Sequence, residues 1–226
     1  MSGKFGAAWE SGREAAPRLG RDEIVRAALE LLESGGLDGF SMRKLAVALD
    51  IKSPSLYWHV KNKDELFDLV IDTVFGRCPL PGDEDVPWPE RVKDVGMTWR
   101  RVLLNHPAAA RLLPSRIPSG PNAMRLADHV VGILLRAGFD AKTASYGYLT
   151  LHFYVTGFAC LEVAYVGGAA PGTISLDDYA GILAGLPSED FPNLAAVSGD
   201  LLAGHLTARF EYGLGGIVDK LAKELG

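Results

Sequence analysis

A short stretch of the chain gathers side chains that can contact a polyanion. Residues 53–63 read SPSLYWHVKNK and combine hydroxyl, aromatic, imidazole and ammonium groups. Hydroxyls can hydrogen-bond to base edges or phosphates, aromatic rings can pack on a thymine methyl or a sugar, and ammonium groups neutralise phosphates. Adjacent helical residues point about 100° apart. Tyr57 and Trp58 therefore cannot share one narrow apolar face, and at least one of them must face outward.

The positive charge of the chain is concentrated around this stretch. The formal net charge is −5, which by itself indicates no nucleic-acid partner. Between residues 39 and 63, however, there are five basic residues and one acid, Asp50, a local balance of 5 − 1 = +4. The basic residues are Arg43, Lys44, Lys52, Lys61 and Lys63.

Helical patterns precede this stretch and would position it. Apolar residues recur at helical spacing and stop at a glycine pair, which predicts a first helix over residues 22–34. Ser41 is a good N-cap, and Phe40 and Leu45 stand where a hydrophobic staple forms. A second, short helix is therefore predicted over residues 42–49.

A tight turn and two further helix starts follow. Asp50 is a residue type that tolerates left-handed backbone geometry, as a turn requires. Ser53 and Pro54 are typical of the N-cap and first position of a helix, which here would be very short. Asn62, followed three residues later by Glu65, predicts the start of a fourth helix.

Two short helices joined by a tight turn and held against a longer helix form a helix-turn-helix, whose second member lies in the major groove of DNA. In this arrangement Leu56 faces the core, whereas Tyr57, Trp58 and His59 lie around the exposed sides. The spacing also leaves an alternative open. The two large aromatics could cover the core of a small bundle, the lysines could form a solvated face, and His59 could be structural.

The segment from Leu19 to Leu66, LGRDEIVRAALELLESGGLDGFSMRKLAVALDIKSPSLYWHVKNKDEL, closely resembles the DNA-binding domain of the tetracycline-repressor (TetR) family. Its LYWHVKNK motif is most similar to the subgroup around the tetracycline repressor itself. The family implies an all-helical, dimeric, bacterial transcriptional regulator. At Ser53 this chain lacks the longer polar side chain of that repressor, so the operator sequence of the repressor is not carried over.

The residues and the resemblance together give a set of expected DNA contacts on double-stranded operator DNA. The set comprises Ser41, Arg43, Ser53, Pro54, Ser55, Tyr57, Trp58, His59, Lys61 and Lys63.

The proline- and acid-rich segment RCPLPGDEDVPWPE indicates a domain boundary near residue 80. We expect a loose arm over residues 1–19, a DNA-binding domain over 20–75 and a regulatory, dimerisation domain over 80–226. Apolar residues recur at helical spacing from 88 to 104, from 123 to 137 and from 202 to 221, so the fold class is all-α.

Residues 143–161, TASYGYLTLHFYVTGFACL, contain no Asp, Glu, Lys or Arg and approach the length of a membrane span. Several hydroxyls and a histidine would lack partners in hydrocarbon, and no basic cluster flanks the segment. We therefore expect no membrane partner, and a helix in a protein core or subunit interface. Small residues on the last helix, such as Ala208 and Gly213, suit close packing across a dimer.

Enzymatic motifs are absent from the sequence, so no catalytic residues are predicted. The chain has no HExxH, GxSxG, GxxxxGK or GxGxxG pattern. Cys78 and Cys160 lie far apart without metal-ligand spacing, which favours a reducing, cytoplasmic location. Two alternatives to a regulator stay open: a helical enzyme or small-molecule carrier without DNA binding, and a protein-interaction module.

The expected ligand cavity of the regulatory domain is mostly apolar. Its predicted lining comprises Trp99, Leu103, Leu112, Phe153 and Thr156, with His152 and Glu162 as polar anchors. For any one of these residues, simple filling of the core is the alternative. Alignment with the tetracycline repressor places Leu112 where that protein has a metal-ligating histidine. We therefore expect no metal, no cofactor and an effector other than tetracycline, namely a hydrophobic, aromatic compound that releases a repressor from an inverted-repeat operator.

Overall fold

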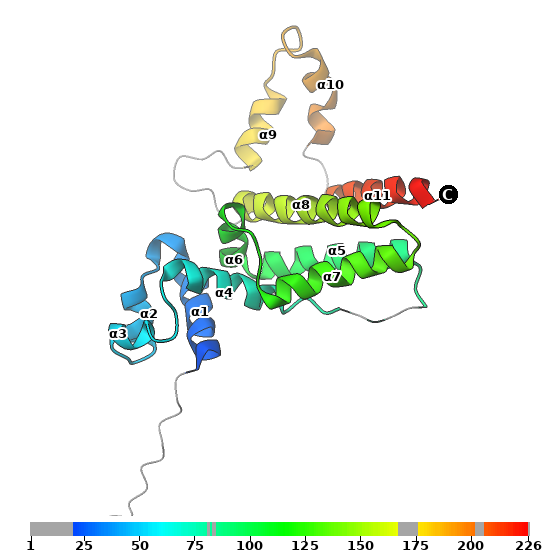
Figure 1. Ribbon diagram of the computed structural model, residues 1–226. Helices are drawn as coiled ribbons and strands as arrows, with labels where there is room; N and C mark the ends of the chain where they lie inside the picture. Colours follow the sequence, from blue (N-terminus) through cyan, green and yellow to red (C-terminus); the bar gives the residue numbers. More distant parts are fainter. Residues whose placement is uncertain (1–19, 81, 83–84, 167–175, 202–205, 226) are drawn as a thin grey trace, which may run out of the picture.

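The computed structural model describes residues 20–80, 82, 85–166, 176–201 and 206–225, and the expected arm over residues 1–19 lies outside this range. Within it every regular element is helical, which confirms the all-α class (Figure 1). The first four helices, here called the head, are α1 Arg21–Gly39, α2 Met42–Ala48, α3 Ser53–Leu56 and α4 Lys63–Phe75. The rest are α5 Trp88–Asn105, α6 Pro107–Leu112, the 3₁₀ turn η1 Leu113–Ser115, α7 Pro121–Arg136, α8 Ala141–Val166, α9 Leu176–Ala184, α10 Pro192–Leu201 and α11 Leu206–Leu225.

Local capping determines where the helices of the head begin. The Ser41 hydroxyl accepts a hydrogen bond from Lys44 N at 3.2 Å, and the Asn62 side chain accepts one from Glu65 N at 2.8 Å, which confirms both predicted N-caps. Asp50 has a φ of 52°, the left-handed geometry expected in the turn between α2 and α3.

Two predicted helix boundaries differ in part from the structure. The first helix leaves helical geometry at the glycine pair, as predicted, because Gly36 adopts a φ of 67°, and a short helical stretch that was not predicted then completes α1 to Gly39. The N-cap of α3 is Lys52, whose backbone is extended, so Ser53 is already the first helical residue and Pro54 follows it within the first turn.

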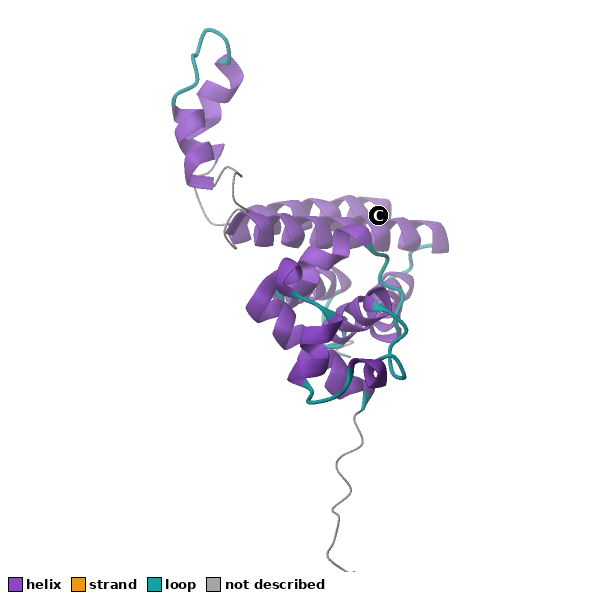
Figure 2. Cartoon of the chain, turned by 90° about the vertical axis from the view of Figure 1, so that its left-hand side faces the viewer, coloured by secondary structure: helices purple, strands orange, loops and turns teal. Residues whose placement is uncertain are grey.

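The body of the molecule consists of α5–α8 and α11. In Figure 1, α8 and α11 run side by side in opposite directions, with α5 and α7 beneath them. One hydrophobic core runs through the head and the body without interruption. Helices α9 and α10 form a hairpin that stands away from the body in both views (Figures 1 and 2).

Helix α8 is buried on one side only. Ala144, Leu151 and Val155 are buried, whereas Tyr146 and Phe153 are exposed to 63% and 69%. By length and composition α8 is the one helix in the described ranges that could span a membrane, and 22% of its most apolar stretch is buried. Core helices of soluble proteins can have the same length and composition.

Candidate functional sites

The segment after α2 is built so that its large aromatics face solvent. Helix α3 has only four residues, and Leu56 and Val60, exposed to 0% and 1%, anchor it and the following turn in the core. His59 N and Val60 N donate to Leu56 O at 3.0 and 3.1 Å, which fixes the turn. Tyr57 and Trp58 are consequently exposed to 51% and 88%. The alternative interpretation of Trp58 as a core aromatic is therefore wrong.

The other predicted DNA contacts lie before and after these two aromatic residues in the sequence, and most of them are exposed. Arg43 projects from α2, and Pro54 and Ser55 are exposed on α3, whereas Ser53 and His59 are half-buried. Ser41 is half-buried at the start of α2, where its hydroxyl oxygen accepts the capping hydrogen bond from Lys44 N.

The exposed lysines differ in what holds them. The Lys63 ammonium lies 5.4 Å from the ring centre of Phe40 and 5.1 Å from that of Phe67, so two aromatic faces orient its charge. Lys61 is exposed, and its backbone N donates to Glu65 Oε2 at 2.6 Å. The sequence pattern gave no sign of the contact between Lys63 and Phe40, which is 23 positions away, whereas Phe67 lies one helical turn after Lys63 on α4.

Among the predicted ligand residues, Trp99 of α5 and His152 of α8 are in contact within the body. Trp99 and Leu103 are each exposed to only 1%, and Leu112 to 5%. The ring of His152 lies 5.3 Å from that of Trp99, and Thr156 follows His152 by one helical turn. Burial lowers the pKa of His152, so its imidazole is neutral at pH 7.

The remaining two predicted ligand residues have different surroundings. Phe153 lies on the exposed side of α8, apart from the buried set, although its ring is 5.5 Å from His152. Glu162 is buried, and its two carboxylate oxygens accept hydrogen bonds from Arg100 Nε and Nη2 at 2.8 and 2.7 Å. Contact of Glu162 with a ligand would require this ion pair to open.

Arg100 was missed in the sequence, although it is a charged residue within an apolar helical pattern. Its side chain is exposed to 7%, and besides Glu162 it donates to Thr207 Oγ1 at 3.2 and 3.3 Å. Its guanidinium group lies 5.0 Å from the ring centre of Phe210. The ion pair therefore joins α5, α8 and α11.

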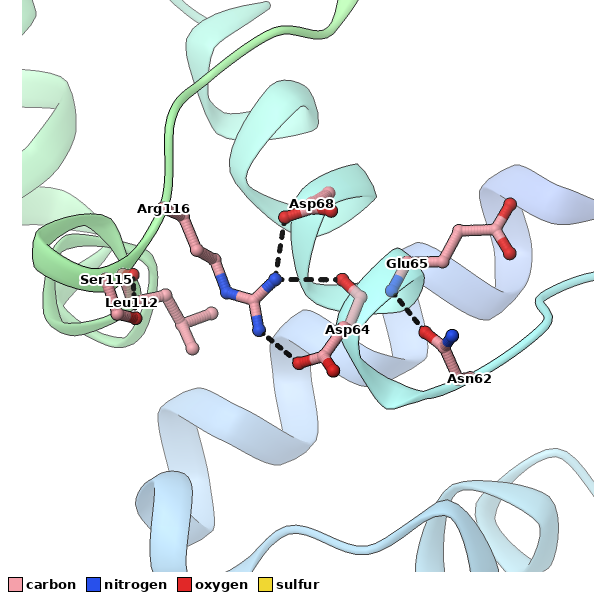
Figure 3. Close-up of polar contacts among 7 residues, drawn as sticks. All are labelled: Asn62, Asp64, Glu65, Asp68, Leu112, Ser115 and Arg116. Atoms are coloured by element: carbon pink, nitrogen blue, oxygen red, sulfur yellow. Dashed lines mark hydrogen bonds and ion pairs between the residues drawn. The ribbon is translucent and has the colours of Figure 1, made fainter.

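Arg116, just after η1, ties the body to the first turns of α4. Figure 3 shows its guanidinium group between two acidic side chains, where it donates to Asp68 Oδ1 at 2.7 Å, to Asp64 O at 3.1 Å and to the Asp64 carboxylate. The same group lies 5.4 Å from the ring centre of Phe67. We call Arg116, Asp64 and Asp68 the Arg116 clamp.

Two other polar clusters join the head to the body. Asp72 on α4 accepts hydrogen bonds from Asn122 N at 2.9 Å and Ala123 N at 3.0 Å, and so caps α7. The imidazole of His106 bonds to Glu33 of α1 through Nδ1 at 2.6 Å and to Arg77 through Nε2 at 2.8 Å. The head is thus attached to the start of α6 and to α7 by hydrogen bonds between residues 51 and 73 positions apart.

Two hollows in the surface of the described part of the chain are lined by residues other than the predicted ligand residues. One of about 820 Å³ opens between α8 and α11 and is lined in part by Tyr146, Gly147, Gly213 and Gly216. A smaller one of about 140 Å³ lies beside Arg116 and Asp72. In the described ranges, no group of three His, Cys, Asp or Glu side chains is placed to hold a metal ion.

The chain matches two family models and several known proteins. Bacterial regulatory proteins of the tetR family match residues 24–70, and the tetracyclin repressor-like C-terminal domain matches residues 79–225. An HTH-type transcriptional regulator of Saccharopolyspora erythraea is 38% identical over 76% of this chain and 75% of its own. The class A tetracycline repressor protein from transposon 1721 of Escherichia coli is 31% identical over 91% of this chain and 92% of its own.

Solved structures of TetR family proteins are also similar to this chain. The TetR family protein ActR of Streptomyces coelicolor, in a crystal structure with actinorhodin, superposes with a TM-score of 0.82 and is 38% identical. The superposition covers 93% of this chain and 100% of that one. The structure of ActR without ligand also has a TM-score of 0.82, at 36% identity.

Proposed function

Because the chain belongs to the tetracycline-repressor (TetR) family of bacterial transcriptional regulators, we propose that it is a dimeric repressor that a small, mostly apolar ligand releases from an inverted-repeat operator. The observation that carries the DNA-binding part is the exposure of Tyr57 and Trp58 beside a buried Leu56. Two recognition segments on a dimer would enter successive major grooves. A regulator of this kind has no need of catalytic residues or a cofactor, and acts in the cytoplasm.

Exposed apolar side chains on α8 and α11 support the dimer. Tyr146, Leu149, Phe153 and Leu161 project from one side of α8, and Tyr212 of α11 is exposed to 88%. A continuous apolar face of this kind marks a protein interface. Gly157 and Gly216 have open space where a side chain would stand, so a second copy can approach the backbone closely. This interface, rather than a membrane, is the proposed environment of the apolar side of α8.

Gly213 has a different role from the one expected from its size. A Cβ atom there would lie 2.2 Å from the Tyr154 hydroxyl of the same chain, which donates to Phe210 O at 2.9 Å. Its lack of a side chain therefore serves packing within the protomer. Substitution of Gly213 would disturb the fold before it disturbed assembly.

Release from DNA follows if the ligand favours a head position that does not fit the operator. Phe75 at the end of α4 contacts Trp99 with ring centres 5.6 Å apart, so one of the predicted ligand residues contacts the last helix of the head. The Arg116 clamp connects the same helix to the segment after α6. A ligand can shift the equilibrium between the two head positions only by the difference between its binding free energies for them.

The effector is proposed to be an aromatic compound bound without metal. Relatives include repressors named for tetracycline and ActR, solved with actinorhodin. Leu112, where the resemblance implies a metal-ligating histidine, cannot bind Mg²⁺. We expect tetracycline with magnesium at micromolar concentration to leave the protein–DNA complex intact. Release that a chelator abolishes would contradict this expectation.

The proposed function is tested by selecting DNA fragments from a random pool with the full-length protein and sequencing them. We expect an inverted repeat with half-sites about one helical turn apart. Fragments without a dyad, or no enrichment at all, would favour the alternative of a helical ligand-binding protein or enzyme that does not bind DNA.

A further inference from the structure

Buried polar atoms without partners gather between α5 and α8. In the part of the chain that the structure describes, Trp99 Nε1, His152 Nδ1 and Thr156 Oγ1 are buried and form no hydrogen bond. The rings of Trp99 and His152 are 5.3 Å apart, and Thr156 lies one turn beyond His152 on α8. Only two other buried side-chain atoms of the described ranges share this state, Arg116 Nε and His129 Nε2.

Unpartnered polar atoms in a protein interior require an explanation. Burying such a group without a hydrogen bond is destabilising, and nearly all buried polar groups in folded proteins have a partner. Apolar side chains of similar shape would be more stable at these positions. A cluster of three such atoms is therefore typical of a binding site in which the bound molecule supplies the missing hydrogen-bond partners.

The three groups also define the chemistry of that molecule. The Trp99 indole can only donate, so it requires an acceptor oxygen or nitrogen. His152 is neutral, because burial lowers its pKa, and the Thr156 hydroxyl can donate or accept. The nearest buried charges, Arg100 and Glu162, are paired with each other. The group that matches this cluster is therefore uncharged.

Aromatic rings flank the cluster. Phe75 contacts Trp99 at 5.6 Å between ring centres, and Tyr148 contacts His152 at 5.9 Å. Ring edges and faces at these distances are suited to a planar aromatic molecule. The combination of aromatic surroundings and a donor that must find an acceptor indicates a carbonyl group attached to a ring.

We propose that Trp99 Nε1, His152 Nδ1 and Thr156 Oγ1 recognise an uncharged aromatic ketone or quinone, whose carbonyl oxygen accepts a hydrogen bond from the Trp99 indole. This inference rests on the proposed function, because it assigns the effector of the same regulatory body. It goes further by naming the polar group of the ligand and the three atoms that bind it.

The test compares 1-tetralone, a bicyclic aromatic ketone, with tetralin, the same skeleton without the oxygen. Binding of each to the full-length protein is measured by isothermal titration calorimetry in the absence of DNA. We expect the ketone to bind about tenfold more tightly, the value of one satisfied hydrogen bond in a buried site. Trp99→Phe keeps the aromatic ring but removes the N–H, and should reduce the preference for the ketone several-fold.

A second variant separates binding from structure. Thr156→Val keeps the shape but removes the unpartnered hydroxyl, so it should raise the melting temperature of the free protein and weaken 1-tetralone binding several-fold. Thr98→Val is the matched control, because the buried Thr98 hydroxyl accepts a hydrogen bond from Arg101 at 3.1 Å. That variant should lower the melting temperature and leave the preference for the ketone unchanged.

Several results would overturn the inference. They are the absence of 1-tetralone binding, equal affinities for 1-tetralone and tetralin in the unmodified protein, and a preference for the ketone that Trp99→Phe does not reduce. If Trp99→Phe does not fold, a lower melting temperature of Thr156→Val without loss of ketone affinity has the same meaning. DNA selection is a separate readout, so failure of the ketone assignment with intact operator binding leaves the proposed function standing. A preference for the ketone without DNA binding would support the ketone assignment and contradict the proposed function.

Discussion

Most of the Trp58 indole ring is exposed to water, although its burial would stabilise the fold. The side chain is exposed to 88% although buried Leu56 and Val60 lie two positions to either side. Complete burial of a large apolar side chain contributes about 1.5–3 kcal/mol. The head forgoes this contribution at Trp58 and part of it at Tyr57, which is understandable if a partner surface covers both rings.

Lys63 and Tyr57 should have separable effects on DNA binding. We expect Lys63→Ala to weaken binding to every sequence alike and to reduce the slope of log affinity against log salt by about one. Tyr57→Ala should instead change which sequences are preferred. Fluorescence anisotropy titrations of a selected site and a scrambled one, each at several salt concentrations, measure both effects.

Lys142 offers a matched control for this pair of variants. Its ammonium also lies over an aromatic ring, that of Tyr146 at 5.8 Å, but on α8 of the body. Lys142→Ala should leave the affinity and the salt slope unchanged. Altered selectivity in Lys63→Ala together with unaltered selectivity in Tyr57→Ala would reverse the assigned roles.

At the scale of elements, the Arg116 clamp should stabilise the junction between α4 and the segment after α6. Arg116→Met keeps an aliphatic chain near Phe67 but removes the contacts with Asp64 and Asp68. Because both carboxylates are largely exposed, we expect the free energy of unfolding to fall by only about 1 kcal/mol. Urea denaturation at low salt measures this loss.

The loss should shrink at high salt, because screening already weakens the ion pairs of the unmodified protein. Arg111→Met, an exposed arginine on α6, serves as the control and should change the free energy of unfolding by less. Equal losses for the two variants, or a loss that does not depend on salt, would show that the clamp does not hold the junction.

Interactions between residues close in the sequence could be predicted, whereas interactions between distant residues could not. The caps at Ser41 and Asn62 involve residues three positions apart, and both were predicted correctly. The interruption of α1 at the glycine pair was also predicted, because Gly36 leaves helical geometry, whereas the short helical stretch that follows it to Gly39 was not. The start of α3 moved by one residue because local signals define helix ends only within a residue or two.

Contacts between distant elements could not be predicted. The Arg100–Glu162 pair spans 62 positions, and no periodicity indicates which buried carboxylate meets which guanidinium group. The exposed position of Phe153 was missed for a related reason. In a helix without charges, such as residues 143–161, the pattern does not distinguish the side that faces the core from the side that is exposed in the single chain.

At the scale of the whole molecule, the exposed side of α8 should hold two copies together. Leu149→Glu places a charge on this side, at a residue exposed to 43% in the single chain. We expect it to convert the dimer to monomer at micromolar concentration, as measured by sedimentation equilibrium, because a buried, unpaired charge is costly. Met124→Glu on α7, exposed to 49%, is the control and should leave the dimer intact.

Loss of the dimer in both variants, or in neither, would place the interface elsewhere. A monomeric unmodified protein at these concentrations would contradict the proposed assembly altogether. Because a monomer carries one recognition segment, Leu149→Glu should also weaken binding to a full operator much more than binding to a single half-site.

The central claim, that two exposed α3 segments read DNA together, is tested most directly by changing the spacing of the selected operator. Inserting five base pairs between the half-sites rotates one of them by about half a turn, while every base of both half-sites is kept. We predict that the affinity falls at least about a hundredfold, towards that of random DNA, as expected for loss of one specific half-site. An operator that binds equally well with and without the insertion would contradict the account.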